Sequence, residues 1–541
     1  MSSTNKLRLV VYGIDSADWQ VMQPFLEAGD LPNLAELMER GSHGTLESTI
    51  PPITAVAWPA AFTGTNPGKH GLFYFFHLRD GRVRAISNAD RRKPALWEML
   101  SEAGLRVGTF TVPFTYPADE IEGWMVAGRG GGHAWDERSV RPSELHAELE
   151  PLLRQYPDFN LMMDRRDPRK ARLLMEGLSN RVGWARRLLG HLLERHPVDV
   201  LIAVENITDT AQHKFITSRR LGQEQEDMVR WAYQQADETL GLMRRYTDDD
   251  TVFLLLSDHG AQPIAGYFDH AAWLAQQGYL HYHAASPSAF LRRRLLRLGA
   301  RAYHTLIRSL RLRSAITPLE RVARFIKFYK LVDWSRTRAF SWPGGGIIIN
   351  TPGRSPNPTV APEDREALAR EIRDRLEEVD NPITGRRDLK AYLREELYEG
   401  PCIEEAPDVF VAPSDFAVAV MNSSPPPRLD KAFWTEEELR QAGLGYIIAC
   451  EGEHRRQGIV VLSPAPQALP PQARIMDIAP TVLALLGLPV PDYMDGRSLI
   501  GAERREEAPA AERRAEADMG PVYTEEEEEQ IARRLADLGY L

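Results

Sequence analysis

Six acidic and imidazole side chains stand beside apolar runs that predict buried strands. They are Asp15, Asp209, His213, Asp258, His259 and His454. Imidazole nitrogens and carboxylate oxygens are ligands that hold Zn²⁺ in proteins, and Mn²⁺ accepts the same types of donor. If these six groups come together in the folded chain, they form a divalent-metal site.

One threonine, Thr54, lies near the start of the segment PPITAVAWPAAFTGTNPGKHG, which runs from Pro51 to Gly71. It comes after a Pro-Pro pair and opens a small-residue stretch that predicts a helix. Thr54 could cap this helix, since threonine is a favoured N-cap residue. It could also be a nucleophile, but a hydroxyl attacks nothing at neutral pH unless a base or a metal ion lowers its pKa. Both roles remain open at this point.

The metal-site hypothesis depends on where these residues lie relative to the predicted strands. Asp15 ends one strand, and the pair Asp258 and His259 ends another. Asp209 and His213 are four residues apart, which places both on one face of the helix that begins there. Side chains at the carboxyl ends of separate parallel strands converge. Because a lone Asp at a strand end is usually a cap or turn residue, it is this convergence that favours a metal site.

The elements that would position these residues form an α/β pattern. Short runs rich in Val, Ile and Leu alternate with longer amphipathic segments. The predicted strands are 7–15, 106–114, 198–206, 251–260 and 458–466, and the predicted helices include 31–41, 93–104 and 185–196. Strands that are apolar throughout and separated by helices indicate a mostly parallel central sheet with helices on both faces. His454 precedes the last of these strands.

The 541 residues divide into five predicted regions. Residues 1–282 form the first part of the α/β core, and residues 336–501 form its second part with a small α+β subregion. Between them, residues 283–335 form a basic helical insertion, or lid. Residues 502–520 are a low-complexity linker, and residues 521–541 form a C-terminal helix.

Two charged stretches each have two interpretations. Residues 286–330 carry twelve Arg and Lys against one acid, Glu320. They could form a lid that binds a second phosphate, a polyanionic substrate or an anionic membrane surface, or an amphipathic helical pair with a solvated face. The acidic run after Thr524 is either a binding tail or a solvated helix start. With Glu527 three residues after Thr524, it predicts a capping box.

Composition limits the partners and the compartment. The formal net charge of −10 argues against general nucleic-acid binding, which usually needs a basic domain. Two cysteines, Cys402 and Cys450, are too few for a disulfide framework and fit a reducing compartment. The sequence enters its first predicted strand almost directly, without a secretory pattern, and no apolar run approaches the roughly 20 residues that span a bilayer. We therefore expect a cytoplasmic protein.

Several motifs, taken in order, resemble the alkaline phosphatase superfamily, and within it the type I phosphodiesterase/nucleotide pyrophosphatase-like predicted phosphohydrolases. They include GIDSADW, PPITAVAWPAAFTGTNPGKHG, TDTAQH, SDHG, GEHRRQGIV and DIAPTVLALLGLPVPDYMDGRSL. The resemblance covers nearly the whole chain and implies an alkaline-phosphatase-like sandwich fold. It also implies a metal-dependent hydrolase of phosphodiesters or phosphomonoesters.

Carried over position by position, the resemblance implies a site for two divalent ions, with Zn²⁺ preferred and Mn²⁺ as the alternative. The implied ligands of the first ion are Asp15, Thr54, Asp258 and His259. The implied ligands of the second ion are Asp209, His213 and His454. Two neighbouring ions can clamp the attacking and leaving oxygens of a displacement at phosphorus. The resemblance thus implies that Thr54 attacks and forms a phosphothreonine intermediate.

One position departs from the pyrophosphatase pattern. Those enzymes commonly have an Asn three residues after the nucleophile, whereas this chain has Ala57, which puts nucleotide specificity in doubt. The expected substrate is a phosphorylated small molecule or a lipid-like ester. A phosphomutase of the same superfamily and a non-catalytic binding protein are the alternatives, while a sulfatase would need Cys or Ser in place of Thr54. The sequence leaves the oligomeric state open.

Overall fold

The largest element of the protein is a nine-stranded sheet with strand order β20-β2-β19-β9-β1-β8-β5-β6-β7. Its strands are β1 (Leu9–Ile14), β2 (Ser42–Glu47), β5 (Val107–Phe110), β6 (Gly123–Val126), β7 (Val140–Arg141), β8 (Val200–Glu205), β9 (Val252–Leu256), β19 (Gln457–Ser463) and β20 (Ala473–Arg474). The structure is a computed structural model. It describes residues 7–79, 82–128, 135–157, 168–217, 226–283, 331–412, 418–421, 428–442, 450–501, 522–524, 527–528 and 530–531.

The strands at the centre of this sheet are parallel. β1 pairs with β8 on one side and β9 on the other, and β5 and β6 continue the parallel set beyond β8. β19 is antiparallel to both of its neighbours, β9 and β2, and β7 is antiparallel to β6. The prediction of a mostly parallel sheet is confirmed. The predicted strand 458–466 corresponds to β19, which runs against the majority.

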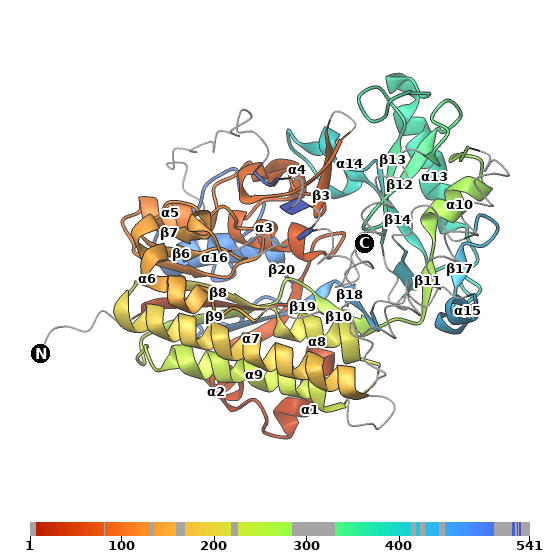
Figure 1. Ribbon diagram of the computed structural model, residues 1–541. Coiled ribbons are helices and arrows are strands. Elements are labelled where there is room, and N and C mark those ends of the chain that lie inside the picture. The colour runs from red at the N-terminus through yellow and green to blue at the C-terminus, as the bar shows by residue number, and fades with distance from the viewer. Residues whose placement is uncertain are drawn as a thin grey trace, which may run out of the picture.

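Helices cover both faces of the sheet (Figure 1). One face packs against α1 (Trp19–Glu27), α2 (Pro32–Arg40), α6 (Ser143–Leu153), α7 (Pro168–Arg195), α8 (Ile207–Phe215) and α9 (Glu226–Arg244). The other packs against α3 (Thr54–Thr63), α5 (Leu96–Glu102) and α16 (Ile478–Leu485). Alternate residues of β1 serve the two cores: Val10 and Tyr12 face the first, Leu9 and Val11 the second. A strand buried on both faces must be apolar throughout, and β1 is.

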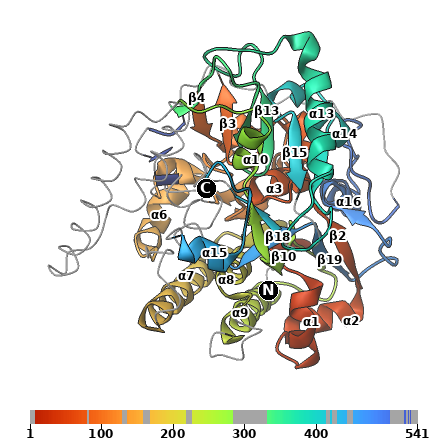
Figure 2. The ribbon, with the colours of Figure 1, turned by 90° about the vertical axis from the view of Figure 1, so that its right-hand side faces the viewer.

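A smaller α+β region lies beside the main sheet and has a hydrophobic core of its own. Its four-stranded antiparallel sheet has the order β12 (Ala339–Trp342), β13 (Gly346–Ile349), β15 (Val409–Ala412) and β14 (Lys390–Leu393). A three-stranded sheet has the order β16 (Val418–Val420), β11 (Gly266–Phe268) and β17 (Phe433–Trp434). The flanking helices are α10 (His270–Gln276), α13 (Arg365–Glu377), α14 (Arg394–Leu397) and α15 (Glu436–Gln441). Figure 2 shows α13 beside β13 and β15.

Two two-stranded antiparallel sheets and a one-turn helix lie outside these larger sheets. β10 (Gly260–Pro263) pairs antiparallel with β18 (Gly452–Arg455). β3 (Phe76–Arg79) pairs with β4 (Arg82–Ala85), and α4 (Pro67–His70) follows α3. β10 follows the carboxyl end of β9 and β18 leads into β19, so this strand pair lies at the edge of the sheet where the predicted ligands are expected.

Some predicted regions fall largely outside the described residues. This holds for 284–330 of the basic insertion and for the whole linker 502–520, and the region boundaries stay predictions. The start of the C-terminal helix is described: the N–H of Glu527 donates to Thr524 Oγ1 at 3.2 Å, and the N–H of Thr524 donates to Glu527 Oε2 at 2.8 Å. The predicted capping box is thus confirmed. Within the described part of the chain, no helix has the length and apolar character needed to cross a bilayer.

Candidate metal centre

The seven predicted site residues meet at the carboxyl edge of the central strands. Asp15 follows β1, Asp258 and His259 follow β9, Asp209 and His213 lie on α8 after β8, His454 lies in β18, and Thr54 is the first residue of α3. All seven side chains are buried. Five separate elements therefore deliver carboxylates, imidazoles and one hydroxyl to a single interior site.

The first group of ligand atoms surrounds Nε2 of His259. Thr54 Oγ1 lies 3.2 Å from this nitrogen, Asp258 Oδ2 3.1 Å and Asp15 Oδ1 3.8 Å. Asp15, Asp258 and His259 each offer one ligand atom to a common point. The hydroxyl of Thr54 is next to the same point, which places the candidate nucleophile within reach of an ion held there.

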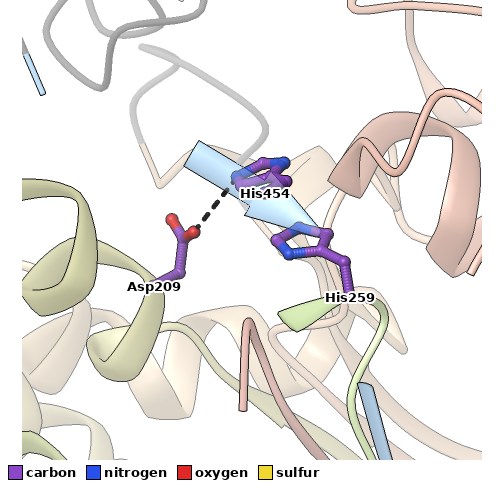
Figure 3. A group of neighbouring side chains, drawn as sticks. All are labelled: Asp209, His259 and His454. Atoms are coloured by element: carbon purple, nitrogen blue, oxygen red, sulfur yellow. Dashed lines mark ion pairs between the residues drawn. The ribbon is translucent and has the colours of Figure 1, made fainter. Parts of the chain in front are cut away.

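The second group surrounds Oδ1 of Asp209. His213 Nε2 lies 3.2 Å from this oxygen and His454 Nε2 3.5 Å, while the two nitrogens are 2.9 Å apart. Figure 3 shows Asp209 and His454 pointing toward one another, with His259 beside them. Ligand atoms of Asp209, His259 and His454 lie within 4.8 Å of one another. His259 thus stands between the two groups, and its ring stacks on that of His454 at a centroid distance of 3.6 Å.

Backbone carbonyls fix the tautomer of all three imidazoles. Each Nδ1 lies within hydrogen-bond distance of a carbonyl oxygen, with the pairs His213–Gly452 at 2.9 Å, His259–Gly260 at 3.2 Å and His454–Pro52 at 2.8 Å. A carbonyl can only accept, so each neutral ring carries its proton on Nδ1 and presents a lone pair on Nε2. Outer hydrogen bonds of this kind orient metal-ligating histidines. Two lone pairs 2.9 Å apart repel unless a proton or a cation lies between them.

The three carboxylates leave an oxygen without a hydrogen bond on the side of the site. Among the described residues, Asp15 Oδ1, Asp209 Oδ1 and Asp258 Oδ2 are buried and accept no hydrogen bond. The opposite oxygens of two of them are held: Trp58 Nε1 donates to Asp15 Oδ2 at 3.3 Å, and the N–H of Ser16 donates to Asp258 Oδ1 at 3.2 Å. Buried unsatisfied oxygens of native proteins often mark a site for an ion or water.

Burial raises the pKa values of two of these acids, while neighbouring imidazoles lower that of the third. Burial, reinforced by the charges of Asp258 and Asp209, raises the pKa of Asp15 well above its ordinary value. Burial raises the pKa of Asp258 to about 8, with a further contribution from Asp209. For Asp209 burial acts in the same direction, but the imidazoles of His213 and His454 outweigh it and lower the pKa. Three buried carboxylates with three imidazoles are best compensated by cations.

Thr54 does not cap its helix. The N-cap of α3 is Ile53, which has an extended backbone, and Thr54 already has helical geometry. The alternative role of Thr54 as an N-cap is therefore wrong. Because the ring of His259 donates through Nδ1, its Nε2 accepts the hydroxyl proton of Thr54. The hydroxyl thus contacts an imidazole of the candidate metal centre.

Comparison with known families decides the class of the protein. The sequence model described as type I phosphodiesterase/nucleotide pyrophosphatase matches residues 9–438. The chain belongs to this family. It is a phosphoester hydrolase of the alkaline phosphatase superfamily, as the sequence motifs predicted.

Solved structures with a similar chain path include two hydrolases of low sequence identity. Phosphonoacetate hydrolase from Sinorhizobium meliloti, in complex with phosphonoacetate, has 12% identity, and the match covers 88% of this chain and 95% of that chain with a TM-score of 0.48. Murine ectonucleotide pyrophosphatase/phosphodiesterase 5, in complex with AMP, has 10% identity, and the match covers 90% and 96% with a TM-score of 0.48. No curated protein matches the sequence.

Two residues that contact this phosphodiesterase-family site, Ser16 and Trp58, were not predicted from the sequence. Ser16 has a left-handed φ of 63°, and this conformation turns its N–H toward Asp258. No sequence pattern signals it, because non-glycine residues rarely adopt such angles. Trp58 could have been found: it lies four residues after Thr54, hence on the same face of the same helix.

Proposed function

We propose that this phosphodiesterase-family protein hydrolyses phosphoesters through a phosphothreonine intermediate on Thr54, at a site for two divalent cations. The observation that carries the proposal is the burial of three orphaned carboxylate oxygens and three imidazole Nε2 atoms beside one hydroxyl. A buried cluster of this composition is costly without cations, and a hydroxyl beside cations becomes a nucleophile.

The donor set fits two ions. Asp15, Asp258, His259 and Thr54 would hold the first, and the second would be held by the remaining ligands, Asp209, His213 and His454. Each set combines imidazole nitrogen with carboxylate oxygen, a mixture that suits Zn²⁺ and also Mn²⁺. Zn²⁺ is the preferred assignment because three of the six ligands other than Thr54 are imidazoles.

The reaction then follows from the position of Thr54. When bound, the cations supply positive charge that lowers the pKa of the hydroxyl and of water and neutralises charge on the phosphoryl oxygens. Thr54 loses its proton, its Oγ1 forms a bond to phosphorus, and the bond from phosphorus to the leaving oxygen breaks as that oxygen takes up a proton. A water molecule next attacks phosphorus, the bond to Thr54 breaks, and the hydroxyl regains its proton.

The substrate we propose is a phosphorylated small molecule or a lipid-like phosphoester. Ala57 is buried in α3 and offers no side-chain donor where pyrophosphatases commonly carry Asn, which disfavours a nucleotide. Cys402 and Cys450 are both buried and form no disulfide, which supports a reducing compartment and therefore the cytoplasm.

The test compares Thr54→Ala with Thr54→Ser as its matched control. Thr54→Ala is expected to fold and to retain two divalent ions per chain by elemental analysis, while turnover of chromogenic mono- and diesters falls by about 10³-fold or more. Thr54→Ser keeps a hydroxyl and retains part of the activity. Product analysis separates free phosphate or monoester from an isomerised product, which would indicate a mutase. Near-normal turnover of Thr54→Ala, or a wild-type chain without divalent ions, would exclude this mechanism.

A further inference from the structure

One helix brings two different groups to the candidate metal centre. Thr54 is the first residue of α3, and Trp58 lies four residues later, one turn along the same face. The hydroxyl of Thr54 faces His259 at 3.2 Å, while the indole N–H of Trp58 donates to Asp15 Oδ2 at 3.3 Å. The candidate nucleophile and a contact to a candidate ligand are therefore fixed by one rigid element.

The Trp58 ring is held from two sides. A Cβ atom placed on Gly13 of β1 would lie 2.4 Å from Cη2 and 2.9 Å from Cζ3 of Trp58, so only glycine leaves room for the ring there. On α3 itself, Phe62 stacks on the indole with a centroid distance of 5.6 Å and an interplanar angle of 12°. Trp58 is completely buried. Its N–H therefore has one fixed direction, toward Asp15, which directly follows β1.

The contact divides the two oxygens of Asp15 between two tasks. Oδ2 accepts the indole proton, and Oδ1, which accepts no hydrogen bond among the described residues, faces His259 at 3.8 Å. An indole N–H is a donor only, so it cannot compete with Asp15 as a ligand and cannot accept a proton from it. The indole therefore occupies Oδ2 and leaves Oδ1 as the carboxyl oxygen that faces the candidate metal centre.

The backbone beside Asp15 is gripped as well. The hydroxyl of Thr208 donates to the carbonyl oxygen of Asp15 at 2.5 Å, and Gln212 Nε2 donates to the carbonyl oxygen of Ser16 at 2.7 Å. Both donors lie on α8, the helix that carries Asp209 and His213. The main chain of Asp15 is thus fixed by α8, and its carboxylate is fixed by α3.

We propose that Trp58 is a positioning residue of this phosphoesterase: its indole N–H aims Asp15 Oδ1 at the first ion, and its ring sets the distance between that ligand and Thr54. This inference rests on the proposed function. A purely structural role for the ring would require only its volume. The positioning role requires the N–H.

The chain offers a matched control for this distinction. Trp97 on α5 is also buried, and its Nε1 donates to Asp119 Oδ2 at 2.8 Å, outside the candidate metal centre. Trp58→Phe and Trp97→Phe remove the same donor from the same type of acceptor and keep an aromatic ring. Any general cost of losing a Trp–Asp hydrogen bond is common to both variants.

The experiment measures divalent-ion affinity by chelator competition with Zn²⁺ and Mn²⁺, together with melting temperature and kcat and KM on a chromogenic phosphoester. Trp58→Phe is expected to weaken binding of one ion by about 10-fold to 100-fold, the range typical of residues that orient a ligand. Its kcat falls while KM changes little. Trp97→Phe should bind both ions as the wild type does, with a similar fall in melting temperature.

A second substitution keeps the test valid if Trp58→Phe does not fold. Replacing Trp58 by β-(3-benzothienyl)alanine exchanges the N–H for a sulfur atom and preserves the shape of the ring, and the same loss of affinity is expected. If this variant and Trp58→Phe bind both ions as tightly as the wild type, the inference is overturned while the proposed function stands. If the wild-type chain binds no divalent ion, the proposed function fails first.

Discussion

Two groups of buried carboxylates in this molecule are compensated in opposite ways. Beside α5, Asp119 accepts hydrogen bonds from Arg91 Nη2 at 2.9 Å and from Trp97 Nε1 at 2.8 Å, and Glu98 binds the other side of Arg91 at 2.7 Å. At the carboxyl edge of the sheet, no described Arg or Lys pairs with Asp15, Asp209 or Asp258, and one oxygen of each carboxylate accepts no hydrogen bond from a described residue. The first group carries its own cation.

This difference separates a group that is compensated by a side chain of the protein from one that an external cation could compensate. A buried ion pair with satisfied hydrogen bonds can hold a fold together, and breaking it by removing one partner is costly because a charge is left uncompensated. A buried set of acids and imidazoles without an Arg or Lys partner carries this cost of uncompensated charge in the folded chain. An external cation can remove that cost, so the free energy of metal binding and the stability of the folded protein are coupled.

The largest expected effect comes from neutralising an acid of the metal centre. Asp258→Asn should reduce kcat/KM by about 10³-fold or more, because the proposed first ion would lose a ligand. In a chelating buffer at neutral pH, its free energy of unfolding should not fall, because burial raises the pKa of Asp258 to about 8 and the substitution therefore replaces a largely uncharged acid by an amide of similar size. The measurements are steady-state kinetics on a chromogenic ester and urea denaturation. A marked loss of stability in chelator would mean that Asp258 is compensated as Asp119 is.

Arg91→Met should give the reverse pattern. The free energy of unfolding is expected to fall by about 3–5 kcal/mol, because Asp119 and Glu98 lose their buried cation. Metal content and kcat/KM of the folded fraction should stay at the wild-type values. Urea denaturation, elemental analysis and kinetics on the same preparation test this. Loss of metal with unchanged stability would remove the distinction between the two groups.

Removing the metal should lower stability to an intermediate degree. A ligand that binds only the folded state stabilises it by about 2.7 kcal/mol when its free concentration is 100 times its dissociation constant. Chelation should therefore lower the melting temperature of the wild type. Arg91→Met should show a similar decrease, since its metal centre is intact. Asp258→Asn should show a much smaller one. An equal decrease in both variants would locate the stabilising ion outside the Asp258 group.

The sequence predicted more of this arrangement than one might expect, for a local reason. Asp15 and Asp258 directly follow apolar strands, and the i, i+4 spacing of Asp209 and His213 fixes a common face of α8, so short segments determine where these side chains point. The antiparallel direction of β19 could not be predicted, because a run of apolar residues carries no direction. The position of His454 depends on its pairing with Ala261 between β10 and β18, which are far apart in the sequence.

The N-cap of α3 was beyond the sequence, and so was the partner of Trp58, although helical spacing places Trp58 on the same face as Thr54. Threonine is a more common N-cap than isoleucine, so local preference favoured Thr54 over Ile53, whereas the fold places Thr54 inside the helix. The indole contact to Asp15 joins α3 to the end of β1, where Gly13 leaves room for the Trp58 ring. Such tertiary contacts override local propensity and leave no periodic signal.

The smallest effect is expected at a surface group with the same types of donor as the second metal group. Glu148 on α6 lies 2.7 Å from His191 Nε2 and 3.1 Å from His196 Nε2, but all three side chains are partly exposed. Water screens such pairs, so Glu148→Gln should change the free energy of unfolding by less than about 1 kcal/mol and leave metal content and turnover unchanged.

The pH dependence of that small contribution has a defined sign. Hydrogen bonds from His196 and His191 hold the pKa of Glu148 below its ordinary value. Any stabilisation is therefore present above the ordinary carboxyl pKa of about 4.3 and is lost as the pH falls through the lowered value. Urea denaturation of wild type and Glu148→Gln near pH 6, and again at acid pH, should show a small difference that disappears on acidification. If Glu148→Gln instead removed an ion from the protein, donor type and not burial would decide where this chain binds metal, and the contrast between its two buried groups would lose its physical basis.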